Sequence, residues 1–117
     1  MSSVTKPILL DETGQAILAA LQNIQKSVIE ESVSGATPTI TAVDNHRYLC
    51  GTVTSLSFTP SQTGICSVLF TAGSGCTVTL PNTVKLPEEF DPTDLEEDAI
   101  YEINVADGIY GVVGKWA

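Results

Sequence analysis

The hydrophobic pattern of the chain changes period once, and this change constrains the fold more than any other feature. Up to residue 31 the apolar residues recur with the spacing of an α-helix. From residue 39 onward they alternate with Thr and Ser, which is the period of a β-strand. The intervening residues 32–38 are small and include a Gly and a Pro, so they predict a linker. We therefore expect a mainly β protein with an N-terminal α-helix.

The predicted helix covers residues 15–31, after an extended anchor at residues 1–14. Its apolar stripe consists of Ile17, Leu21, Ile24 and Val28. These positions follow a heptad seam, with Leu at position a and Ile at position d, a combination that favours three or four strands over two. A single helix of this length is marginal in water, so its stripe must be covered by the β domain or by other copies. We expect a homo-oligomer, with a trimer as the first choice, whose interface is this seam.

Residues 39–117 contain several short candidate strands, separated by turn signals every 8–12 residues. The segment 52–59 alternates, with Leu56 and Phe58 on one face, and residues 65–71 form a nearly continuous apolar run. No internal repeat is evident. The pattern predicts a small antiparallel β-sandwich or barrel-like head, carried on the helical oligomerisation stalk.

The clearest turn signal lies near the C-terminus, where Asp107-Gly108 is typical of a two-residue type I′ hairpin loop. With these two residues as the loop, Ile103 would pair with Val112. The residues of the second strand that share the phase of Val112, including Trp116, would then face the core.

The charge of the chain is concentrated in one segment. Five Lys and Arg residues stand against 14 Asp and Glu residues, a net charge of −9, and most of the excess lies in residues 88–98. This balance excludes a basic nucleic-acid binder and a protein that binds anionic membranes, and no apolar run has the length of a membrane span. The acidic block lacks the spacing and central Gly of a calcium-binding loop, so we expect a solvated loop.

No constellation of residues predicts catalysis, a cofactor or a metal. Cys50, Cys66 and Cys76 are odd in number and lack zinc-ligand spacing, so we expect buried apolar thiols in a protein made in a reducing cytoplasm. A nucleophilic pair of Cys50 with His46, the only histidine, is the enzymatic alternative, but no oxyanion element stands nearby in the sequence.

The aromatic residues offer one candidate ligand platform. It comprises Tyr48, Tyr110 and Trp116. Such side chains can stack on a sugar, and burial in the core is the competing interpretation in a chain with only seven aromatic residues.

The chain resembles phage head-fibre and related virion-appendage proteins. The resemblance is carried by the opening segment Val4–Gly14, which leads into the helix and the Ser/Gly linker. It continues in Pro38-Thr39-Ile40, in Leu80-Pro81-Asn82 and in the closing segment from Tyr101 to Trp116. The likeness spans most of the chain and brings no catalytic residues with it.

The resemblance implies a non-enzymatic structural protein of the virion, made in the host cytoplasm. Residues 1–14 would attach it to a capsid or tail protein, and the β domain would be exposed, with a host-surface glycan as a further partner. Because the chain is short for a fibre, a trimeric decoration knob fits it better than a shaft. The alternatives are a carbohydrate-binding or host-adhesion module and a phage-encoded cytoplasmic inhibitor of a host protein.

Overall fold

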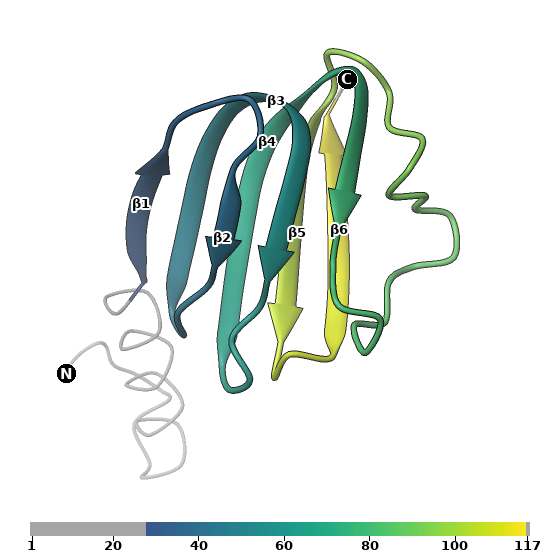
Figure 1. Ribbon diagram of the computed structural model, residues 1–117. Helices are drawn as coiled ribbons and strands as arrows, with labels where there is room; N and C mark the ends of the chain where they lie inside the picture. Colours follow the sequence, from purple (N-terminus) through teal and green to yellow (C-terminus); the bar gives the residue numbers. More distant parts are fainter. Residues whose placement is uncertain (1–27, 117) are drawn as a thin grey trace, which may run out of the picture.

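The computed structural model describes residues 28–116, and this part of the chain consists of strands and loops (Figure 1). The strands are β1 (Ile29–Val33), β2 (Thr39–Thr41), β3 (His46–Thr59), β4 (Ile65–Thr79), β5 (Ile100–Ala106) and β6 (Tyr110–Trp116). They form one mixed sheet in the order β1-β3-β4-β5-β6, with β2 also paired to β3. The mainly β prediction is confirmed. Within the described range there is no helix that is long and apolar enough to cross a membrane.

Most of the predicted helix at residues 15–31 lies outside the described residues, but its last residues do not. Ile29–Val33 form β1, so strand replaces the predicted helix at residues 29–31 and the first two residues of the predicted linker. The reason is pairing with β3, in which Ile29 lies beside His46 and Val33 beside Cys50. β-Branched residues at both ends of this segment suit an extended backbone.

The two long strands fold back on themselves, which divides the sheet into two layers (Figure 1). Tyr48 and Phe58 both belong to β3, and in a straight strand they would lie about 33 Å apart. Their ring centroids are only 6.3 Å apart, in an edge-on contact. The larger layer therefore holds β1, the first halves of β3 and β4, β5 and β6. The smaller layer holds β2 and the second halves of β3 and β4.

The pairings β1–β3, β2–β3 and β3–β4 are all parallel, which corrects the prediction of an antiparallel sheet. Only β4–β5 and β5–β6 are antiparallel. Residues 29–79 thus form three stacked coils, each running up one layer and down the other, as in a β-solenoid. Neighbouring coils are joined by backbone hydrogen bonds such as Ala42 N–H to the Thr59 carbonyl, 2.8 Å. This structural repeat leaves no visible repeat in the sequence.

Glycines lie where the long strands turn from one layer to the other. In β4, Gly73 and Gly75 flank the corner, and Gly75 has a φ of 67°, a left-handed value that costs glycine little. Thr54 of β3 stands opposite residues 73–76 there, because the pairing jumps from Val53–Ala72 to Ser55–Thr77. The sequence signal at residues 72–75 is therefore a corner within one coil rather than the loop of an antiparallel hairpin.

The core lies between the two layers and consists of alternate residues of every long strand. Its largest fully buried members are Phe58, Phe70, Leu56, Ile103, Val53, Val68 and Val105. Leu56 and Phe58 share the inward face, as their alternation predicts. Tyr101 of β5 stacks on Phe70 of β4, with ring centroids 5.7 Å apart.

The β5–β6 hairpin departs from the predicted register by one residue. Asp107 and Gly108 have the positive φ values of the predicted turn, 55° and 71°. However, the carbonyl of Ile109 accepts a hydrogen bond from Lys85 N–H, so pairing starts with Ala106 and Tyr110. A slip of one residue turns every side chain of β6 to the other face. The predicted inward orientation of this strand is therefore wrong.

The segment between β4 and β5 covers one end of the two layers. Val84 and Ala99 are buried, whereas Phe90 and Leu95 pack against the core from its edge. The acidic residues between them are all exposed, as expected for a solvated loop. The loop thus packs apolar side chains against the core and presents acidic side chains to solvent.

Candidate functional site: the outer face of the larger layer

The surface of the larger layer that points away from the core is the candidate site, and we call it the outer face. In β4, for example, Cys66, Val68 and Phe70 are buried in the core, and the residues between them point the other way. The outer face consists of Glu30, Ser32, Arg47, Leu49, Ile65, Ser67, Leu69, Thr71, Ile100, Glu102, Asn104, Ala106, Tyr110, Val112, Gly114 and Trp116.

Large apolar side chains are exposed on the outer face, although half-buried sheets usually present polar residues to water. The relative exposures are 64% for Val112, 59% for Tyr110, 55% for Ile65, 53% for Trp116 and 40% for Ile100. Leu49 and Leu69, farther toward β1, are half-buried. Scattered apolar residues are normal on a surface, but a group on one flat face indicates a contact surface.

These residues come from paired positions of adjacent strands. Ile65 of β4 and Tyr110 of β6 lie on either side of Ala106 of β5. At the other end of the hairpin, Ile100 is paired with Trp116. The ring of Trp116 also covers the backbone at Gly114, because a Cβ added there would lie 3.3 Å from Trp116 Cη2. Exposed apolar side chains therefore lie at both ends of the β5–β6 hairpin.

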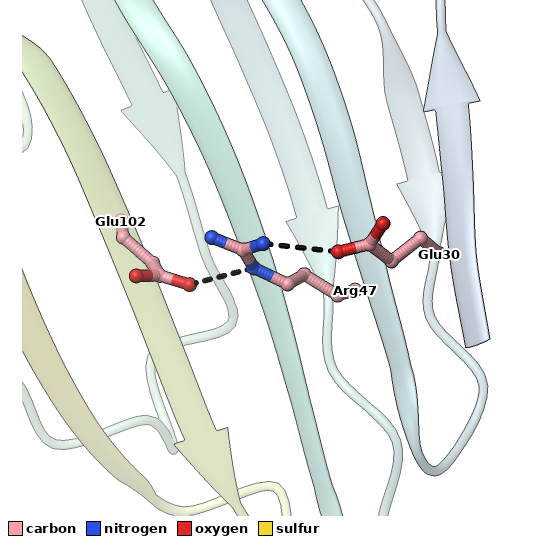
Figure 2. Close-up of polar contacts among 3 residues, drawn as sticks. All are labelled: Glu30, Arg47 and Glu102. Carbon is pink, nitrogen blue, oxygen red and sulfur yellow. Dashed lines mark hydrogen bonds and ion pairs between the residues drawn. The ribbon is translucent and has the colours of Figure 1, made fainter. Parts of the chain in front are cut away.

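A single cation ties three strands together on this face (Figure 2). Arg47 of β3 donates from Nε to Glu102 of β5 at 3.0 Å and from a terminal nitrogen to Glu30 of β1 at 3.1 Å. The arginine thus reaches across β4, which lies between β3 and β5. The hydrogen bond to Glu102 is the main cause that raises the pKa of Arg47, and Glu30 adds to it. The charges of the outer face are therefore largely compensated within the face.

A hollow of about 420 Å³ lies at the edge of the outer face. Its lining includes Val28, His46, Arg47, Ile65, Glu102 and Asn104. Val28 is the last residue of the predicted seam, and it is 42% exposed. The chain therefore enters the β domain beside the outer face.

The structure separates the three residues of the predicted ligand platform. Tyr48 is buried, with 5% of its surface exposed, and its hydroxyl accepts a hydrogen bond from Val43 N–H at 2.9 Å. It belongs to the core and cannot join a surface platform. Tyr110 and Trp116 are exposed on the outer face, because the hairpin register differs from the predicted one. Of the predicted interface residues, Ile17, Leu21 and Ile24 lie outside the described range.

The cysteines occupy apolar surroundings and form no disulfide within residues 28–116. Cys66 and Cys76 are buried and Cys50 is half-buried. Burial raises the pKa of each of the three thiols, which keeps them protonated at neutral pH.

The histidine of the alternative Cys–His pair has other partners. Its Nε2 lies 3.3 Å from a carboxylate oxygen of Glu31, and its Nδ1 lies 3.0 Å from the Asp44 carbonyl oxygen. The ring of His46 also stacks on that of Tyr48. Across the part of the chain that can be described, no group of three or more His, Cys, Asp or Glu side chains is arranged to hold a metal ion.

A second hollow, of about 460 Å³, lies under the acidic loop and was not anticipated from the sequence. Its lining includes Phe90, Leu95, Glu96, Tyr101, Val113 and Lys115. Glu96 N–H donates to the Tyr101 hydroxyl at 2.8 Å, and Lys115 binds the Glu96 carboxylate at 2.5 Å. The hydrogen bond to Glu96 raises the pKa of Lys115. These contacts hold the loop against β5 and β6.

No protein-family model, curated protein or solved structure significantly matches the chain.

Proposed function

We propose that this chain is a non-enzymatic structural protein of a phage virion. In this proposal it is a small oligomeric decoration of the capsid or tail, most simply a trimer, anchored by its N-terminus and exposing its β domain. The observation that carries the proposal is the apolar outer face, since a sheet surface of this composition suits protein–protein contact. The resemblance of the opening and closing segments to head-fibre proteins supplies the virion context.

The other features of the structure agree with an architectural role. The stacked coils give a rigid two-layered body whose core is built from aliphatic and aromatic side chains. The acidic loop adds a solvated surface that keeps exposed copies soluble and apart.

The location of the protein tests the proposal directly. Phage particles produced by a host that expresses the chain with a C-terminal epitope tag are purified on a density gradient and labelled with gold-conjugated antibody. We expect gold at a fixed site on the particle and a constant copy number per particle by quantitative mass spectrometry. Deletion of residues 1–14 should abolish the labelling. The same variant should remain folded and be recovered from the soluble lysate. Particles devoid of the wild-type protein would contradict the proposal.

A host-adhesion or carbohydrate-binding role is the second candidate, and the exposure of Tyr110 and Trp116 favours it. Both side chains stand on the outer face, and aromatic rings of this kind stack on sugars. Trp116 is the only tryptophan, so its fluorescence reports directly on an occupied platform. A change in Trp116 emission on addition of a glycan, lost in Tyr110→Ala, is the expected result. An unchanged emission together with a silent glycan array would remove this candidate.

A further inference from the structure

We infer that the outer face is a contact surface between copies of this chain. The inference rests on the proposed oligomer and deepens it. It assigns to the assembly a second interface, on the β domain, beside the predicted helical seam. Its occupant is the β domain of another copy.

The size of the outer face suits this role. Five strands span about 19 Å, and seven residues along each strand span about 23 Å. The projected area is therefore roughly 400 Å², and the accessible area of its side chains is larger. A standard interface buries about 800 Å² on each partner. The outer face thus supplies a large part of what a stable association needs, and the predicted seam supplies the rest.

The distribution of charge favours contact at this surface. The chain carries a net charge of −9, so two copies repel each other over most orientations. Of the nine acidic residues from position 88 onward, only Glu102 belongs to the outer face, and Arg47 binds it. Glu30, the other acid on the face, also binds Arg47. The residual charge of the face is therefore about one negative unit, which is small beside the net charge of the chain.

The path of the chain connects this surface with the predicted seam. Val28, the last seam residue, lines the same hollow as Ile65 and Arg47 of the outer face. The predicted seam therefore ends beside the outer face. In a closed cyclic assembly held by that seam, the same face of every copy can turn toward the axis.

Trp116 and Val112 provide the test, because both lie on the outer face of β6. The full-length protein is studied at micromolar concentration by sedimentation, and the accessibility of Trp116 is measured by acrylamide quenching. Val112→Asp is the interface variant, and Ile65→Asp is a second one on β4. Val43→Asp is the matched control, since Val43 is 53% exposed but lies in the loop between β2 and β3. Circular dichroism checks that each variant is folded.

We expect a wild-type oligomer in which Trp116 is shielded from acrylamide. Val112→Asp and Ile65→Asp should weaken association at least tenfold and raise the quenching constant of Trp116 at least twofold. Val43→Asp should leave both quantities unchanged.

Three other outcomes would overturn the inference, and they differ in what they imply for the proposed function. A wild-type oligomer with freely quenched Trp116, unaffected by either interface variant, would leave the seam as its interface. A monomer with shielded Trp116 would show that residues 1–27 of the same chain cover the outer face. A monomer with freely quenched Trp116 would remove both the interface and the proposed oligomer.

Discussion

At the scale of single residues, Gly64 shows how closely the loops between coils are packed. Its φ is 69°, and a Cβ at this position would overlap the carboxylate of Asp44. Any larger residue at this position would therefore adopt a strained backbone and would also have to displace the Asp44 side chain. Gly75, at the corner of β4, has nearly the same φ of 67° but has nothing within 4 Å of a Cβ.

These two glycines form a matched pair for mutation. Gly75→Ala should lower the free energy of unfolding by about 1 kcal/mol, the cost of a left-handed backbone for alanine. Gly64→Ala should lower it further, because the Asp44 carboxylate must move away from the new methyl group in addition to the same backbone cost. Chemical denaturation of both variants measures the difference. Equal losses would show that Asp44 does not confine Gly64.

The thiol of Cys66 predicts a dependence of stability on alkaline pH. Burial raises the pKa of Cys66 above its ordinary value of 9.0. Because the unfolded chain releases this proton at lower pH than the folded chain, the stabilisation is complete below pH 9.0 and is lost as the pH rises through the folded pKa. Denaturation at a series of pH values should therefore show a shallower alkaline loss for Cys66→Ala than for the wild type. Parallel curves for the two proteins would contradict a raised pKa of the Cys66 thiol in the folded chain.

Arg47 is a further residue whose role can be measured. Replacing it by Met keeps much of the side-chain length but leaves Glu102, whose side chain is only 19% exposed, without its cation. We expect a loss of about 1 kcal/mol in the free energy of unfolding, since the pair is only partly shielded from water. Glu30→Gln, at the more exposed partner, is the control and should cost less. A Met variant as stable as the wild type would show that the ion pairs do not tie the strands together.

At the scale of the elements, β6 is where the sequence and the structure differ most instructively. The Asp107-Gly108 signal correctly locates the turn. However, nothing in the sequence indicates that Lys85 N–H would donate a hydrogen bond to the carbonyl of Ile109. That contact comes from a loop more than 20 positions earlier in the chain. Local turn chemistry therefore fixes where a hairpin bends, and a long-range contact fixes its register.

The register of β6 is tested by two neighbouring valines. Val113 is half-buried and packs against the core, whereas Val112 is 64% exposed on the outer face. Under conditions where the chain is monomeric, Val113→Thr should lower the free energy of unfolding by about 1–2 kcal/mol through burial of a hydroxyl. Val112→Thr should change it by no more than about 0.5 kcal/mol. The reverse order would support the two-residue loop and the inward orientation of Val112.

Most strands of the three coils were predictable as strands but not as coils, and β1, predicted as the end of the helix and the start of the linker, was not predictable even as a strand. The alternation in residues 52–59 identifies the inward side of that segment, and Leu56 and Phe58 are indeed buried. The alternation of a segment does not indicate which other strand pairs with that segment. Parallel partners here are 17 to 22 residues apart, as in Ile29 with His46 and Ser55 with Thr77. This spacing is irregular, and equivalent positions of the three coils hold different side chains. No repeat therefore appears in the sequence.

At the scale of the whole molecule, the structure separates an apolar surface from an acidic one. Exposed apolar side chains gather on the outer face of the larger layer, and the acidic loop covers one end of the two layers. The sequence locates the acidic block because the residues are contiguous. It could not locate the outer face, because that surface is assembled from five strands and depends on the register of β6.

We propose that copies of this chain assemble through the predicted seam and the outer face. The most direct test of this assembly is the molar mass of the purified full-length protein, measured by light scattering at micromolar concentration. We predict three times the chain mass of 12.3 kDa for the wild type and the mass of one chain for Leu21→Asp/Ile24→Asp. A wild-type protein that scatters as a monomer would contradict the proposed assembly.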